Sequence, residues 1–193
     1  MRADITHETI LVFDFGSQYT QLIARRIRES GVFSAIVPYN KELENLKNIN
    51  IKGIIFSGGP NSVYSKNAPK IPSEILDLNV PVLGICYGLQ LIMDMLGGKV
   101  EAAARREYGK ANLEAEKNSK LFSDIQSNST VWMSHGDKVT RIAPGFKSIA
   151  RTNNSPYAAV EHEEKPLFGL QFHPEVQHTI HGREILKNFC FEI

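Results

Sequence analysis

The chain has 193 residues, of which 42% are hydrophobic and 22% charged, values that are ordinary for one globular domain. The formal net charge of +1 gives no electrostatic reason to expect a nucleic acid or an anionic membrane as a partner. The sequence has no apolar run long enough to span a membrane, no signal-peptide start and only two cysteines. We therefore expect a single domain, residues 1–193, in the reducing cytoplasm.

The first half of the chain alternates short apolar runs with amphipathic segments. Apolar runs rich in β-branched residues predict buried strands at residues 10–16, 33–37, 53–56 and 80–85. Helical spacing of apolar residues predicts helices at residues 21–30, 41–46, 72–78 and 87–96. This alternation predicts an α/β fold with a parallel sheet wound like that of flavodoxin, with helices on both faces.

Beyond Gly98 the pattern changes to short strands separated by turns that contain glycine, proline and asparagine. The expected strands are residues 100–104, 108–113, 130–133, 148–152, 158–162 and 167–172, and a last helix is expected at 179–189. These strands predict antiparallel additions to the sheet and a covering layer. The expected fold is therefore an open mixed sheet of flavodoxin-like type, with a parallel core flanked by helices and antiparallel additions in the C-terminal half.

Residues 80–90 read as a buried strand, a sharp turn and the start of a helix. Cys86 occupies the turn, and Gly84 and Gly88 flank it in the pattern G-x-C-x-G, which is the cysteine form of the nucleophile elbow. Glycine is required there because a Cβ would collide where the strand and helix backbones approach each other. A helix N-terminus favours the thiolate form of such a cysteine, so we predict that Cys86 is a nucleophile.

Backbone amides near Cys86 could stabilise an oxyanion. Residues 57–60, Ser-Gly-Gly-Pro, follow the neighbouring expected strand, and a glycine pair can present free N–H groups. In elbow geometry the second donor is the N–H of the residue after the nucleophile, which is Tyr87 here. The same Gly-Gly pair could instead serve only a turn that needs a positive φ.

A candidate base follows the last expected strand. His173 and Glu175 are separated by one residue, so they project to the same side if the extended geometry persists. Glu175 could then bind one imidazole nitrogen and leave the other to activate Cys86. Cys86, His173 and Glu175 together form a nucleophile, a base and an orienting carboxylate.

These motifs, in this order, resemble those of the class I glutamine amidotransferases, and the resemblance covers nearly the whole chain. Within this family, the sequences of residues 14–26, 132–139 and 171–176 are similar to those of the glutaminase domains or subunits of GMP synthases. The resemblance implies a Cys86–His173–Glu175 triad that hydrolyses L-glutamine through a γ-glutamyl thioester. It also implies that the backbone N–H groups of Gly59 and Tyr87 hold the oxyanion.

The same resemblance implies a site for the substrate. Gln90 matches a residue that helps to hold glutamine. Ser134, His135 and Asp137 match a loop that grips the α-amino and α-carboxylate groups, partly through backbone atoms. No metal or other cofactor is expected in this domain.

The partner implied by the resemblance is an ATP pyrophosphatase or synthetase domain or subunit that binds ATP and Mg²⁺ and uses ammonia to aminate XMP to GMP. Two other functions stay open. One is a glutaminase-like regulatory or docking subunit with little activity alone, and the other is the amidotransferase component of a different biosynthetic synthase. A related hydrolase acting on peptides or γ-glutamyl tails is disfavoured by Gln90 and by the His-Pro-Glu triplet at residues 173–175.

Overall fold

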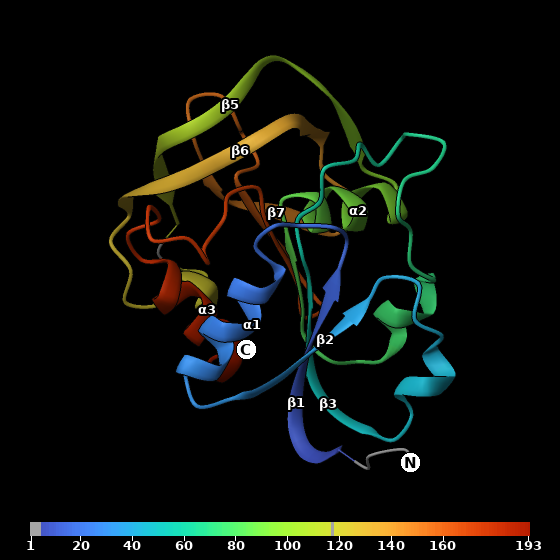
Figure 1. Cartoon of the computed structure of the whole chain (residues 1–193). Coiled ribbons are helices and arrows are strands. Elements are labelled where there is room, and N and C mark those ends of the chain that lie inside the picture. Colours follow the sequence, from blue (N-terminus) through green and yellow to red (C-terminus); the bar gives the residue numbers. More distant parts are fainter. Residues whose placement is uncertain (1–4, 117) are drawn as a thin grey trace.

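Strands from both halves of the chain meet in one open sheet (Figure 1). The structure is a computed structural model that describes residues 5–116 and 118–193. Within those residues the sheet has nine strands in the order β2-β1-β3-β4-β9-β8-β7-β5-β6. The strands are β1 (Ile5–Asp14), β2 (Phe33–Pro38), β3 (Ile49–Phe56), β4 (Val82–Ile85), β5 (Lys99–Ala115), β6 (Asn128–Arg141), β7 (Phe146–Arg151), β8 (Ala159–His162) and β9 (Leu167–Leu170).

The direction of the strands divides the sheet into two parts. Strands β2, β1, β3, β4 and β9 are parallel to one another, whereas the pairings from β9 through β8, β7 and β5 to β6 are all antiparallel. The prediction of a parallel core with antiparallel additions is therefore confirmed. Strand β9 comes late in the chain but pairs directly with β4, so its carboxyl end lies beside the end of β4.

In the part of the chain that the structure describes, three helices cover the two faces of the sheet: α1 (Thr20–Glu29), α2 (Tyr87–Met95) and α3 (Gly182–Phe191). Figure 1 shows α1 and α3 together on one side and α2 on the other. Successive residues of β1 point to opposite faces, so Ile10 joins the core under α1 and Leu11 joins the core under α2. No helix of the described chain is both long and apolar enough to cross a membrane.

The C-terminal half departs from the expected strand boundaries. The two strands expected at 100–104 and 108–113 form one long strand, β5, because a bulge rather than a turn absorbs the charged residues between them. In the bulge, residues 103–106 lie opposite the single residue Gly136. Strand β6 likewise continues through residues 134–137, so the segment expected to be a loop is paired strand.

The short helical segments also differ from the expected helices. The helices expected at 41–46 and 72–78 are single 3-10 turns, Leu43–Leu46 and Ser73–Asp77, and a third such turn is Lys120–Phe122. Sequences this short make too few hydrogen bonds to offset the cost of starting an α-helix. The last helix begins at Gly182 instead of 179, and β9 ends at Leu170 instead of 172.

The packing at Gly88 gives a prediction about stability. A Cβ at this position would lie 2.7 Å from the Cβ of Phe56 on β3, because α2 starts directly against that strand. We expect Gly88→Ala to lower the free energy of unfolding by at least about 2 kcal/mol, measured by chemical denaturation. Gly136→Ala is the control, since its added Cβ would meet no atom closer than 3.7 Å, and it should cost less than about 1 kcal/mol. Equal losses in the two variants would contradict the proposed close packing.

Candidate active site

Cys86 lies in the tight turn between β4 and α2, and only 5% of its surface is exposed. Its backbone has φ 53° and ψ −103°, a conformation that a residue with a Cβ adopts only under strain. The strand and the helix approach so closely here that a Cβ at Gly84 would lie 2.5 Å from the backbone nitrogen of Leu89. Gly88 contacts β3 just as closely, so neither position of the elbow has room for a Cβ. The sequence predicted this requirement for glycine at both positions.

His173 and Glu175 lie just beyond the end of β9, and their side chains are almost fully buried. The Nδ1 atom of His173 is 2.7 Å from Oε1 of Glu175. The extended geometry does not persist here, because Pro174 and Glu175 lie in a turn, but the two side chains still meet. The hydroxyl of Thr179 donates to the His173 carbonyl at 2.6 Å, which helps to fix the turn.

The ring of His173 and the side chain of Cys86 both lie next to Gly58. A Cβ at Gly58 would lie 3.2 Å from Cε1 of His173 and 3.8 Å from Cβ of Cys86. Tyr19, at the start of α1, packs edge-to-face on the imidazole with ring centres 5.4 Å apart. The ring is therefore held between an aromatic side chain, the Glu175 carboxylate and the thiol.

The charge of Glu175 controls the ionisation of His173. Burial by itself lowers the pKa of His173, but the negative charge of Glu175 and the interaction with the Cys86 side chain outweigh it. The pKa of His173 therefore lies well above its usual value. Among the residues that the structure describes, no donor reaches Oε2 of Glu175, so His173 is the main partner of this buried carboxylate.

The amides expected to stabilise an oxyanion flank Cys86. Tyr87 is the first residue of α2, so its N–H has no acceptor within the helix. Gly59 lies in the loop after β3, where a Cβ would come within 2.6 Å of the Phe15 carbonyl. The Ser57 hydroxyl accepts from the Phe15 amide at 3.0 Å and donates to the Gly58 carbonyl at 2.9 Å, which fixes that loop. The side chain of Tyr87 is not part of this arrangement, since it is buried and its hydroxyl donates to the Pro69 carbonyl. Burial also raises the pKa of this hydroxyl to about 12.

Gln90 lies one turn along α2 from Cys86 and is buried. Its Nε2 donates to the Asp137 carbonyl at 2.9 Å and to Oε1 of Gln171 at 3.4 Å. Both hydrogens of this amide are therefore directed at the protein, and its side-chain oxygen is the group left for a ligand. Gln171 in turn places its Nε2 3.8 Å from the Cys86 sulfur.

The three residues expected to bind substrate on β6 have different surroundings. The carbonyl oxygen of Ser134 is 3.8 Å from the Cys86 sulfur, so this residue faces the Cys86 thiol. The side chain of His135 is buried and contacts Glu107 on β5. The carboxylate of Asp137 is occupied by the hydroxyls of Ser62 and Tyr64. The side chains of His135 and Asp137 are thus already engaged by other residues of the protein.

The site thus combines a strained cysteine, a buried imidazole–carboxylate pair and flanking amides at one edge of a sheet. The sequence also matches a model of a known protein family. The model described as glutamine amidotransferase class-I matches residues 11–193. The chain belongs to this family.

Relatives of this amidotransferase chain give a narrower comparison. It is 54% identical over 186 residues to a GMP synthase (glutamine-hydrolysing) of Clostridium perfringens, a match that covers 96% of the chain and 36% of that protein. It is 50% identical over 193 residues to the corresponding protein of Gloeothece citriformis, covering 100% of the chain and 36% of that protein. The chain thus spans about a third of the length of these curated relatives.

Solved structures agree with the fold of the amidotransferase chain. A protein from Thermoplasma acidophilum, provisionally described as one of the subunits of a GMP synthase, superposes with a TM-score of 0.82 at 33% identity, over 95% of this chain and 92% of that one. A glutamine amidotransferase from Thermotoga maritima gives a TM-score of 0.71 at 21% identity, over 88% of this chain and 77% of that one, which shows the fold alone.

Four polar or aromatic residues around this site were not assigned a role from the sequence: Tyr19, Arg26, Gln171 and Thr179. Arg26 donates from Nε to the Glu175 carbonyl at 3.0 Å, across 149 positions of sequence. The sequence did indicate Gln171, because it is a polar residue directly after an apolar run and two positions before His173. The other three are ordinary helix or turn residues until the fold brings them together.

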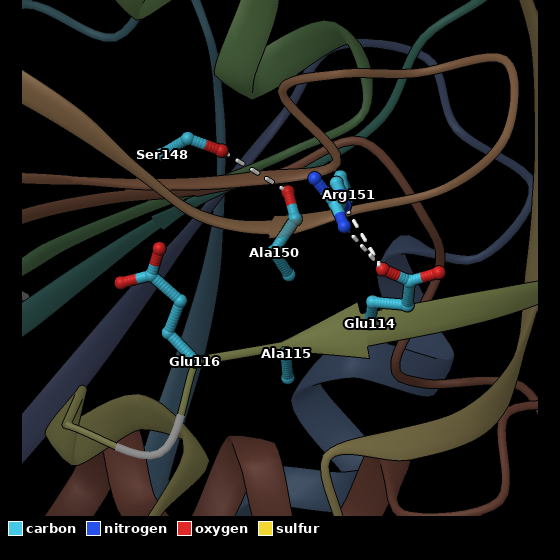
Figure 2. A pocket seen from close by; sticks show the side chains of 6 residues that line it. All are labelled: Glu114, Ala115, Glu116, Ser148, Ala150 and Arg151. Atoms are coloured by element: carbon cyan, nitrogen blue, oxygen red, sulfur yellow. Dashed lines mark hydrogen bonds and ion pairs between the residues drawn. The ribbon is translucent and has the colours of Figure 1, made fainter.

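The described residues also form a cavity of about 300 Å³ away from this site. Figure 2 shows it between β5 and β7, where Glu114 pairs with Arg151 across its mouth. None of the candidate site residues lines this cavity. Groups of three or more His, Cys, Asp or Glu side chains able to hold a metal ion are not found in the described part of the chain.

The raised pKa of His173 gives a prediction about pH. Glu175→Gln removes the charge that favours the imidazolium, so the pKa of His173 should fall, as measured by NMR titration of its ring. Because a raised pKa in the folded state stabilises the protonated form, the contribution of His173 to stability is fully present below about pH 6.5, its unfolded value, and is lost as the pH rises through the folded value. The stability difference between wild type and variant should shrink over the same rise in pH. An unchanged pKa in Glu175→Gln would contradict this coupling.

Proposed function

We propose that this chain hydrolyses L-glutamine to glutamate and ammonia, with Cys86, His173 and Glu175 as the catalytic residues. The observation that carries the proposal is the buried His173–Glu175 pair directly beside a cysteine held in a strained turn. Membership of the class I glutamine amidotransferase family supports it. Neither feature requires a metal or another cofactor in this domain.

In the first half of the proposed reaction, the Cys86 thiolate attacks the side-chain amide carbon of glutamine. Negative charge develops on the carbonyl oxygen, and the N–H groups of Gly59 and Tyr87 are the donors proposed to receive it. His173, protonated because Glu175 raises its pKa, gives a proton to the departing nitrogen. The C–N bond breaks, ammonia leaves, and a γ-glutamyl thioester remains on Cys86.

In the second half, neutral His173 removes a proton from water, which attacks the thioester carbon. The C–S bond breaks, glutamate is released, and the proton on His173 restores the starting imidazolium–thiolate pair. Glu175 keeps Nδ1 as the hydrogen-bonded nitrogen throughout, which leaves Nε2 to exchange protons. The amino-acid end of glutamine is proposed to lie against Gln90 and residues 134–137, with Ser134 nearest to the sulfur.

The acceptor of the ammonia is proposed from the relatives. Proteins named GMP synthase (glutamine-hydrolysing) match this chain over about a third of their length, which leaves room for a synthetase part. We propose that such a domain or subunit, with ATP and Mg²⁺, uses the ammonia to aminate XMP to GMP. Supplying glutamine labelled with ¹⁵N in the amide should then yield ¹⁵N-labelled GMP when the chain is combined with that partner.

Replacing the nucleophile tests the hydrolysis. We expect Cys86→Ala to reduce ammonia release from glutamine to the uncatalysed background, because no other group of the site can form the thioester. A glutamine analogue with a chloromethyl ketone in place of the amide should alkylate Cys86 and lose chloride, which intact-protein mass spectrometry would detect.

Cys190 provides the matched control, since it is the second of the two cysteines of the chain. Burial raises the pKa of its thiol to about 12, so it carries almost no thiolate at neutral pH. Cys190→Ala should keep full activity and full labelling. Ammonia release by Cys86→Ala at the wild-type rate would refute the proposed role of Cys86.

A further inference from the structure

A buried carboxylate lies behind the substrate side of the site and takes no part in the proposed chemistry. Glu107 on β5 is 8% exposed, and directly opposite it on β6 is His135, which is 4% exposed. Nε2 of His135 is 3.3 Å from Oε2 of Glu107, within ion-pair distance but not aligned as a hydrogen bond. The hydroxyls of Thr152 and Ser155 donate to the same carboxylate at 3.2 and 3.0 Å.

These partners keep Glu107 charged. Burial alone raises the pKa of Glu107, but His135 and the two hydroxyls outweigh that effect and hold the pKa below its usual value. A buried charge with several partners resists movement, because moving a partner away would leave the buried carboxylate without that interaction. We call Glu107 and its three partners the anchor. The anchor ties the paired strands β5 and β6 to the loop between β7 and β8, which carries Thr152 and Ser155.

The anchor is connected to the nucleophile through a single carbonyl group. Nδ1 of His135 contacts the Asp137 carbonyl at 2.9 Å, and Nε2 of Gln90 donates to the same oxygen at 2.9 Å. Gln90 lies on the helix that starts at Cys86, and the residue before His135 is Ser134, whose carbonyl faces the Cys86 sulfur. The position of residues 134–137 over the thiol is therefore set from α2 on one side and from Glu107 on the other.

We propose that Glu107 is a positioning residue for glutamine binding. It acts through His135 to hold residues 134–137 of β6 at the distance from Cys86 that the amino-acid end of glutamine requires. The proposal rests on the proposed glutaminase function and extends it to a residue that does not touch the substrate. It places the effect of Glu107 on substrate affinity and not on the bond-breaking steps.

Glu107→Gln tests this role because it keeps the size of the side chain and removes the charge. KM for glutamine should rise roughly tenfold or more, since a displaced binding segment fits the substrate poorly, while kcat changes by less than about threefold. The chloromethyl ketone analogue should show the same split, with a higher half-saturating concentration and a similar maximal rate of alkylation of Cys86.

Glu114→Gln is the matched control. Glu114 lies on the same strand, but its carboxylate is half-exposed and pairs only with Arg151 at the surface, so its loss should leave both constants unchanged. If Glu107→Gln does not fold, Ser155→Ala removes one donor from the carboxylate and should raise KM in the same direction.

The outcomes separate the two proposals. A folded Glu107→Gln protein with unchanged KM and unchanged half-saturation by the analogue, even with a lower Tm, would overturn the positioning role and leave the glutaminase proposal intact. A fall in kcat at constant KM would overturn it as well. A wild-type chain that neither hydrolyses glutamine nor reacts with the analogue would overturn the proposed function, and the positioning role with it.

Discussion

The close approach of three backbone segments at Cys86 is the constraint on which the site depends. Gly84 on β4 packs against the first turn of α2, and Gly88 on α2 packs against Phe56 on β3. This packing holds Cys86 at φ 53°, a conformation whose cost is on the order of 1–3 kcal/mol. The surrounding apolar residues of both core layers offset that cost, since β4 and α2 are almost completely buried.

The order of strands converts this local constraint into a site. Because β3, β4 and β9 are parallel neighbours, the segments that follow them begin at the same edge of the sheet. The loop with Gly59, the turn with Cys86 and the turn with His173 are therefore adjacent although they are far apart in the sequence. Glu175 completes the set, and its carboxylate raises the pKa of the imidazole that burial alone would lower.

Features that are local in sequence could be predicted, and features that depend on distant partners could not. The glycines around Cys86 and the apolar runs of β1, β3 and β4 carry their own evidence, so the elbow and the parallel core followed from the sequence. The bulge in β5 could not be predicted, because its charged residues look like a turn until β6 pairs beside them. The carboxylate of Asp137 looks free for a ligand in the sequence, because nothing near it indicates Ser62 and Tyr64, more than 70 residues earlier.

The two sides of the site are held by different forces. The side that carries Cys86 belongs to the parallel sheet, where burial and backbone pairing fix every strand. The other side is the β5–β6 ribbon, which joins the rest of the sheet through only two register pairs with β7 in the described chain. Buried side chains such as Met133 and Val139 and the His173 N–H, which donates to the Trp132 carbonyl, also hold the ribbon. Around residues 134–137 its position depends in addition on the polar contacts of Glu107, Gln90 and Asp137. Because such contacts are short and directional, losing one is expected to displace residues 134–137 while the turn at Cys86 stays intact.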